Sequence, residues 1–148
     1  MKELLYLDDL QPGMRYKTST HTMDEKQIIE FARQFDPQPF HTDPVAAQQS
    51  LFGGLVASGW HTASITMKLL VENGAPLAGG LIGIEGQMAW PKPVRPGDTL
   101  RVESEVMEVT PSRSRPDRGI ATMRSETLNQ NGDIVQTMMA KLMVFRRK

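Results

Sequence analysis

An acid and a histidine lie five positions apart in a proline-rich stretch, "FDPQPFHTDP" at positions 35–44. Regular structure would not bring Asp36 and His41 together, because this offset turns them apart on a helix and puts them on opposite faces of a strand. Pro37 and Pro39 favour extended and turn conformations, so we expect the backbone between the two side chains to bend. The pair would then flank one small polar volume, where a carboxylate keeps an imidazole basic enough to activate water.

Simpler interpretations of this stretch stay open. An acid before a proline is a common end of a helix, and a histidine in a loop is often an ordinary surface residue. A metal site built on His41 and Asp43 is disfavoured, since no further ligand follows at a recognisable spacing. The sequence therefore predicts no metal.

A glycine-rich run, "GGLVASGWHTAS" at positions 53–64, leads into a predicted helix from about Trp60 to Glu72. This helix ends where Asn73-Gly74 and a proline give a strong stop signal. The N–H groups at the start of a helix lack partners within it and carry partial positive charge. Gly59 would let a substrate approach them closely, as an oxyanion hole requires, although a packing glycine is the simpler alternative.

The elements that must position these groups change in character near Gly80. The segment 20–36, "THTMDEKQIIEFARQFD", has apolar residues at helical spacing, so we expect a helix with one buried face. Its first turn is capped either by a capping box of Thr22 with Glu25 or by Asp24.

Beyond Gly80 the pattern is that of strands, with Asn131-Gly132 predicting a hairpin between the last two. The predicted strands lie within 81–90, 99–109, 120–130 and 134–145. The helix at 60–72 is apolar over most of its surface and therefore needs a large surface to pack against. One buried helix and an antiparallel sheet long enough to wrap it predict an α+β fold.

Length and composition set the outer bounds. A chain of 148 residues fits one domain, 1–148, with a sizeable core. Basic and acidic residues number 17 each, and the zero formal net charge disfavours a nucleic-acid partner. The absence of cysteine excludes thiol nucleophiles and Cys-ligated metals. The first residues do not resemble a signal peptide and no stretch is apolar enough to span a membrane, so we expect a cytoplasmic protein.

Together these segments resemble the MaoC-like dehydratases, or (R)-specific enoyl-CoA hydratases, of the hot-dog superfamily. The family motif is Asp, any residue, Asn, Pro, any residue and His, followed by Asp-Pro and a glycine-bounded approach to the central helix. Here it reads "DPQPFH" at 36–41, "DP" at 43–44 and "FGGLVASGW" at 52–60. The resemblance covers positions 20–145, and its main departure is Gln38, which stands where the family has asparagine.

The resemblance implies a single hot-dog domain, with the sheet wrapped around a long central helix and homodimers, or higher homo-oligomers, joined through their sheets. It implies that Asp36 and His41 activate a water that adds to C3 of a trans-2-enoyl thioester of CoA or acyl-carrier protein. The product would be the (R)-3-hydroxyacyl thioester, with the N–H of Gly59 as oxyanion hole. No cofactor is implied, because the thioester itself accepts the electrons. The other residues expected against the substrate are Gln38, Phe40, Ser58 and Trp60.

Two other functions stay open. A hot-dog acyl-CoA thioesterase would be expected to carry an acid on the central helix, and the only one here is Glu72 at its far end. A non-catalytic acyl-thioester binding protein would keep the fold without turnover. The pairing of Asp36 with His41 argues against that function, whereas Gln38 leaves it open.

Overall fold

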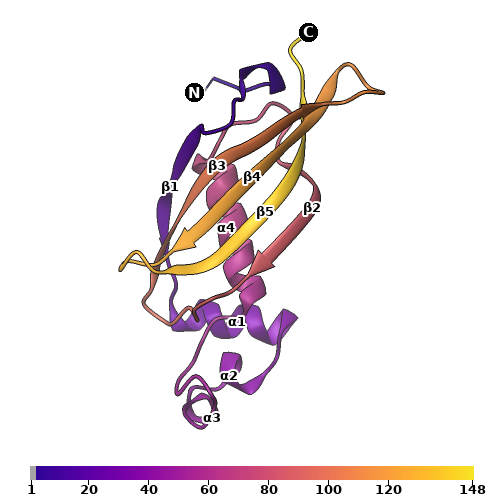
Figure 1. Cartoon of the computed structure of the whole chain (residues 1–148). Coiled ribbons are helices and arrows are strands. Elements are labelled where there is room, and N and C mark those ends of the chain that lie inside the picture. The colour runs from indigo at the N-terminus through magenta and orange to yellow at the C-terminus, as the bar shows by residue number, and fades with distance from the viewer. Residues whose placement is uncertain (1–2) are drawn as a thin grey trace.

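The computed structural model describes residues 3–148 as a five-stranded antiparallel sheet wrapped around one long helix (Figure 1). The strand order is β1-β3-β4-β5-β2, which places β1 and β2 at the two edges. The strands are β1 (Arg15–Thr22), β2 (Ile82–Ala89), β3 (Thr99–Pro111), β4 (Arg118–Leu128) and β5 (Ile134–Phe145). The helices are η1 (Leu7–Asp9), α1 (Glu25–Phe35), α2 (Pro39–Thr42), α3 (Pro44–Gln48) and α4 (Gly59–Asn73). The predicted α+β architecture is confirmed.

The central helix α4 lies against the inner face of the sheet, within one residue of its predicted bounds. Leu69 and Thr66 on its inner side are fully or almost fully buried. Its outer side differs from expectation, because Trp60, Met67 and Val71 remain 58%, 42% and 66% exposed. The chain alone therefore leaves an apolar stripe of α4 uncovered.

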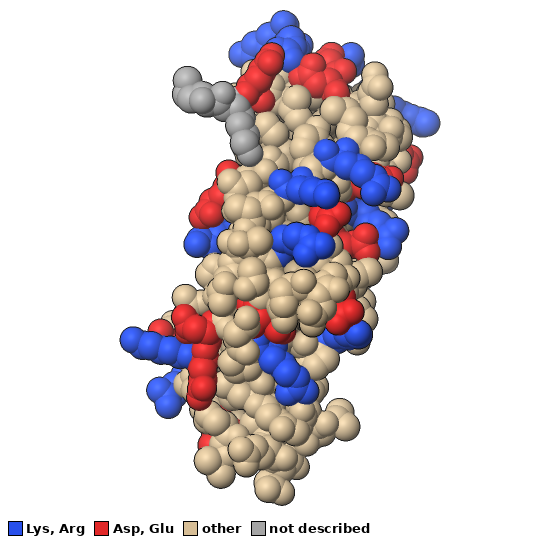
Figure 2. Space-filling view, turned by 90° about the vertical axis from the view of Figure 1, so that its left-hand side faces the viewer, with Lys and Arg blue, Asp and Glu red and all other residues tan. Residues whose placement is uncertain are grey.

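The long strands alternate between a buried inner face and a charged outer face. On β3, Val102 and Val106 point inward and are fully buried, whereas Glu103 and Glu105 point outward. The outward acids pair with bases, as in the 2.8 Å contact between Arg15 and Glu105. Figure 2 shows the result on one face of the molecule, where basic and acidic side chains are interspersed. No helix among residues 3–148 is long and apolar enough to cross a membrane.

Strand β1 is not predicted by the sequence patterns. Its sequence "RYKTSTHT" has one apolar residue, Tyr16, and buries no side chain fully. It is held by backbone pairing with β3, interrupted by an irregularity between Lys17 and Thr20, and by the Thr18 hydroxyl, which accepts the N–H of Val102 at 2.9 Å. Because an edge strand can be held mainly through its backbone, hydrophobic periodicity carries little signal for it.

Helices α1, α2 and α3 lie together at one end of the sheet (Figure 1). Helix α1 is capped by Asp24, which accepts the N–H of Gln27 at 2.7 Å, so the capping box at Thr22 is not formed. It ends at Asp36, whose N–H bonds the carbonyl of Ala32 at 2.8 Å. The expected bend after Asp36 is partly helical, since Pro39 begins the single-turn helix α2. Proline suits a first helical position because its missing N–H would be unpaired there.

Candidate active site

The structure brings Asp36 and His41 together. Asp36 is the residue that ends α1, and His41 lies in α2 one turn later. The His41 Nε2 is 3.2 Å from the Asp36 Oδ2, and the two side chains are 8% and 17% exposed. A break between two short helices thus achieves the convergence that neither a continuous helix nor a strand would allow.

The other ring nitrogen of His41 is fixed by the main chain. Its Nδ1 lies 2.6 Å from the carbonyl oxygen of Val56, in the run that leads to α4. A carbonyl only accepts, so Nδ1 carries a proton and Nε2 is the nitrogen that can gain or lose one. The ring edge also packs against Phe40, with centroids 4.6 Å apart. The reactive nitrogen therefore faces Asp36.

The carboxylate of Asp36 is held in its ionised form by three groups. Partial burial raises the pKa of Asp36. Hydrogen bonds from Gln38 and Ser58 and the charge of His41 lower it by more, so the pKa of Asp36 lies below its usual value. The Gln38 Nε2 donates to Oδ1 at 2.6 Å, which leaves Oδ2 toward the imidazole. Gln38 therefore makes the kind of amide contact that an asparagine could make.

Ser58 and Gly59 form the start of α4. Ser58 is fully buried, and its hydroxyl oxygen caps the helix by accepting the N–H of Trp60 at 3.2 Å. The same hydroxyl hydrogen-bonds the Asp36 carboxylate. A Cβ on Gly59 would lie 2.8 Å from the Cε2 of Trp90. Close packing by an indole therefore already requires glycine here, whatever approaches the helix end from the pocket.

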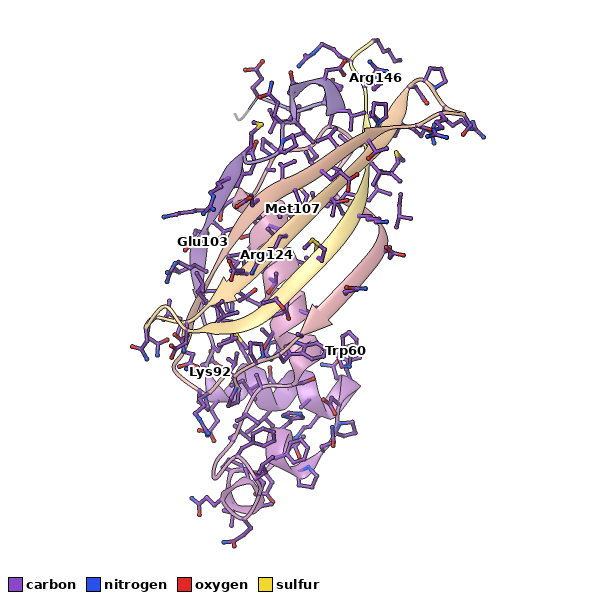
Figure 3. All side chains as sticks on the ribbon, viewed as in Figure 1. Trp60, Lys92, Glu103, Met107, Arg124 and Arg146 are labelled. Carbon is purple, nitrogen blue, oxygen red and sulfur yellow. The ribbon has the colours of Figure 1, made fainter. Side chains whose placement is uncertain are left out.

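A pocket of about 350 Å³ opens beside these groups. Both His41 and Gly59 line it, together with Phe40, whereas the exposed Trp60 lies outside and packs edge-on against Trp90. Figure 3 shows Trp60 and Lys92 at the end of the sheet near α1, with Arg146 at the opposite end. The remaining lining residues are Phe52, Val56, Ala57, Thr62, Trp90, Pro91, Lys92, Pro93, Val94 and Val135.

Several residues of this region are not found by sequence reasoning. Val56 contributes a carbonyl, which no side-chain pattern reveals. Trp90 and Gln136 lie far along the chain from the Asp36 motif. The pairing of β2 with β5 brings the two together, and Trp90 then lines the pocket with Phe40 and His41. A buried glutamine within an apolar strand is the one local hint, since such a residue needs partners.

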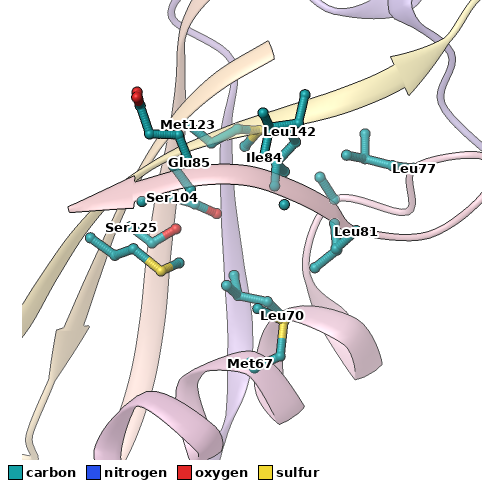
Figure 4. Close-up of a pocket in the computed structure, with 15 residues that line it drawn as sticks. Met67, Leu70, Leu77, Leu81, Ile84, Glu85, Ser104, Met123, Ser125 and Leu142 are labelled. Carbon is teal, nitrogen blue, oxygen red and sulfur yellow. The ribbon is translucent and has the colours of Figure 1, made fainter. Parts of the chain in front are cut away.

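A second cavity, also of about 350 Å³, lies away from the candidate site (Figure 4). It is bounded by Met67 and Leu70 of the second half of α4 and by Ile84 of the edge strand β2. Ser104 and Ser125, paired across β3 and β4, and Glu85 of β2 provide its polar side chains on the sheet. None of the residues predicted to act on a substrate lines this cavity.

No group of three or more side chains with metal-binding potential occurs among residues 3–148. The acid on α4, Glu72, is half exposed and pairs with Lys68 at 3.6 Å. It lies at the end of the helix opposite to Gly59. Asp36 does not line the pocket itself but contacts His41, which does.

Comparison with known proteins fixes the family. The sequence model of the "MaoC like domain" matches residues 9–128. The chain belongs to the MaoC-like domain family. A curated member of similar sequence is the 3-hydroxybutyryl-CoA dehydratase of Methylorubrum extorquens, which is 31% identical over 114 residues, or 76% of this chain and 70% of that protein.

Solved structures agree with this MaoC-like assignment. The MaoC-like dehydratase from Rhodospirillum rubrum matches with a TM-score of 0.95 and 56% identity, over 97% of this chain and 99% of that one. The R-hydratase PhaJ1 from Pseudomonas aeruginosa matches with a TM-score of 0.75 and 25% identity, over 96% and 86% of the two chains. The predicted hot-dog fold is confirmed.

Replacing Gln38 by alanine should raise the pKa of the Asp36 carboxyl, because the variant loses a hydrogen bond that favours the ionised form. The Asp36 side-chain carbon resonance, followed by NMR across an acid titration, measures this pKa directly. The Gln48→Ala variant, changed at an exposed position of α3, is the control and should titrate as the parent does. An unchanged or lower pKa in Gln38→Ala would contradict the role given to this contact.

His61, in the first turn of α4, is a buried histidine whose protonated form is disfavoured in the folded chain. Its ring stacks on Phe31 with centroids 4.5 Å apart, and its Nδ1 has no hydrogen-bond partner among residues 3–148. Burial lowers the pKa of His61 to about 4, helped by the charge of His21 and opposed by Asp24. The folded chain therefore keeps this imidazole neutral where an unfolded chain would protonate it.

Stability should accordingly fall as the pH drops from 6.5 toward 4, since only the unfolded chain takes up the His61 proton in that window. The loss should reach about 3 kcal/mol. The His61→Phe variant keeps a stacking ring and should lose this part of the pH dependence, whereas His21→Gln should retain it. Urea unfolding at about pH 7.5 and about pH 4.5 measures the effect. Equal acid sensitivity in His61→Phe and the parent would be the contrary result.

Proposed function

We propose that the protein adds water to a trans-2-enoyl thioester, carried by CoA or acyl-carrier protein, and gives the (R)-3-hydroxyacyl thioester. The observation that carries this proposal is the 3.2 Å contact between an ionised Asp36 and His41, which lines a pocket together with Gly59 at the start of α4. His41, supported by Asp36, would provide a place for water in this volume, and the helix N-terminus would provide a place for developing negative charge.

Each group has a role in moving protons and electrons. A water held beside the Asp36–His41 pair gives a proton to it as the water oxygen bonds to C3. The electrons of the C2–C3 double bond move onto the thioester oxygen, where the N–H of Gly59 stabilises the enolate. When the enolate collapses, C2 takes from the pair the proton that the water had given to it, and the pair returns to its starting state. The reverse sequence is the dehydration.

The relatives support this substrate class. The Methylorubrum extorquens protein is named a 3-hydroxybutyryl-CoA dehydratase, and the Pseudomonas aeruginosa structure is that of an R-hydratase. Both names describe addition or removal of water, and the first also names a hydroxyacyl-CoA. The contact of Gln38 with Asp36 supports turnover in this chain too, because it keeps the carboxylate positioned.

A thioesterase has less support from the geometry. Hydrolysis directed by an acid on the central helix would depend on Glu72, and this residue is tied to Lys68 at the far end of α4. The Asp36 pair could still activate water toward the thioester carbonyl. Free thiol is therefore a necessary second readout in any activity assay.

The Asp36→Asn and His41→Ala variants should each lower hydration of trans-2-enoyl-CoA substrates by about 10²–10⁴-fold, because each removes a member of the proton-transfer pair. Loss of enoyl-thioester absorbance measures hydration, and thiol release is followed in parallel. The His21→Ala variant changes a histidine outside the pocket and is the matched control. Near-parental rates in either site variant would disprove the assigned roles. Thiol release by the parent that is lost in both variants would show that the pair catalyses thioester hydrolysis and not hydration.

We also propose that the active form is a homodimer joined along β2. Within residues 3–148 this edge strand pairs with β5 alone, so one row of its backbone groups is open for another strand. Ile84 on β2 is 56% exposed beside the cavity that Met67 of α4 also lines. A second copy set against this edge would cover the uncovered apolar stripe of α4.

The parent chain should then show twice the chain mass by size-exclusion chromatography with light scattering, and Ile84→Asp should shift it toward the monomer. The new carboxylate at position 84 would be buried in the proposed interface, and its loss of hydration would destabilise the dimer, whereas a carboxylate at an exposed position stays hydrated. The Val45→Asp variant, at a 73% exposed residue of α3, is the control and should leave the mass unchanged. A monomeric parent, or equal effects of both variants, would contradict the β2 interface.

A further inference from the structure

A network of buried hydrogen bonds ties the central helix to the sheet beside the pocket. The Trp90 Nε1 donates to the Oε1 of Gln136 at 2.9 Å, and the Gln136 Nε2 donates to the Thr66 hydroxyl at 3.2 Å. Thr66 gives its own proton to the carbonyl of Thr62 at 2.8 Å, so the Thr127 hydroxyl, 2.6 Å away, is the donor to Thr66. The donor and the acceptor of each bond in this buried network are therefore defined.

The buried network joins elements that lie far apart in the sequence. Gln136 of β5 and Thr127 of β4 are paired across neighbouring strands. Trp90 directly follows β2, and Thr66 lies in α4. Gln136, Thr66 and Thr127 are fully buried, so a broken bond would leave a polar group without water or partner. Hydrogen bonds are also directional, whereas apolar packing is not, so the network opposes sliding or rotation of α4 on the sheet.

Gly59 lies on the same side of α4 as the buried network. Thr66 follows it about two helical turns later, and Thr62 lies between the two at the spacing that puts residues on one face. Thr62 is buried, and it lines the pocket together with Gly59 and His41. Because its backbone hydrogen bonds keep an α-helix in one shape over two turns, the position of Thr66 determines that of Gly59.

Trp90 fixes Gly59 a second time, by direct contact. Three atoms of its indole would be within 3.2 Å of a Cβ on Gly59, and the ring forms the wall of the pocket at this point. The backbone N–H of Gly59 has no hydrogen-bond partner among residues 3–148, so it remains a donor for a substrate. The glycine is thus held from the helix side through Thr66 and from the sheet side through the indole.

We propose that Gln136 and Thr66 are positioning residues of the hydration reaction, which keep the N–H of Gly59 where the thioester oxygen gains negative charge. The inference rests on the proposed function and deepens it, because it assigns the alignment of the oxyanion hole to two residues outside the pocket lining. A displacement of about 1 Å in a catalytic group can cost about 10²-fold in rate, and loss of an oxyanion-hole donor costs about 10²–10³-fold.

Thr66→Val and Gln136→Met remove hydrogen-bonding atoms from the network and keep side chains of similar size. Each should lower kcat for hydration of trans-2-enoyl-CoA about tenfold or more and change KM by less than about threefold, because the N–H of Gly59 acts on charge that develops in the transition state. Thr66→Ser keeps the hydroxyl and should retain most of the parental kcat. Thr127→Val removes only the bond beyond Thr66 and is the control, with kcat within about threefold of the parent.

Trp90→Phe tests the same link at a 41% exposed position, where a change does not threaten folding. It keeps an aromatic ring beside Gly59 and removes the N–H that Gln136 accepts. Its kcat should fall about threefold or more. Urea unfolding of every variant at about pH 7.5 measures the loss of stability separately from the loss of rate.

The carbonyl stretch of a bound thioester measures the alignment without turnover. Butyryl-CoA with a heavy carbon isotope at the thioester carbonyl cannot be hydrated, and a hydrogen bond from Gly59 should lower its stretching frequency. Isotope-edited infrared difference spectra should show this lowering in the parent, in Thr66→Ser and in Thr127→Val. The lowering should be smaller in Thr66→Val, Gln136→Met and Trp90→Phe. A role in stability alone would leave the frequency at the parental value in every folded variant.

The two proposals fail in different ways. A parent that hydrates enoyl-CoAs, with kcat and carbonyl frequency unchanged in Gln136→Met or in Trp90→Phe, would overturn the inference and leave the proposed function intact. A parent that does not hydrate but lowers the carbonyl frequency through Thr66 and Gln136 would overturn the function and leave the alignment of Gly59. Equal effects of Thr127→Val and Thr66→Val would mean general loosening of the helix and would overturn the positioning role.

Discussion

The packing of α4 against the inner face of the sheet is the constraint on which the rest of the structure depends. Leu69 and the buried threonines place the helix axis, and the helix axis places Ser58 and Gly59 at its start. From there the chain runs back through Val56, whose carbonyl orients His41. A shift of the helix along the sheet would therefore move the cap, the glycine and the imidazole together.

The candidate site lies where two helices meet end to start. Asp36 ends α1, and the hydroxyl of Ser58, the residue that caps α4, hydrogen-bonds its carboxylate. A helix N-terminus favours a nearby negative charge, so this placement and the contact with Gln38 act in the same direction on the carboxylate. The polar part of the site is thus satisfied internally before any substrate arrives, which limits the reorganisation that chemistry would require.

Much of this arrangement could be predicted from the sequence because its signals are local. The spacing of Asp36 and His41, the stop at Pro37 and the glycine entry to α4 are all short patterns with a direct physical meaning. Strand β1 could not be predicted in this way, since an edge strand held by its backbone needs no apolar period. The α2 turn was obscured because Pro39 is compatible with both an extended chain and a first helical position.

The pocket wall was beyond local reasoning for a different cause. Trp90, just after β2, and Gln136, in β5, have no visible relation until the pairing of β2 with β5 puts them in contact. Their significance depends on pairings across 46 positions of chain. Patterns of residue type carry no information on such pairings, whereas a buried amide in a strand indicates only that some partner exists.

The contact between Gly59 and Trp90 has a consequence for how this chain can evolve. The groups that would move protons are assembled from neighbouring segments, whereas the wall beside them is assembled from distant ones. Changes in the wall can therefore accumulate without dismantling the proton-transfer pair. The glycine and the indole are the exception, because any side chain at position 59 demands a smaller ring or a displaced one at position 90. These two positions should vary together across the lineage.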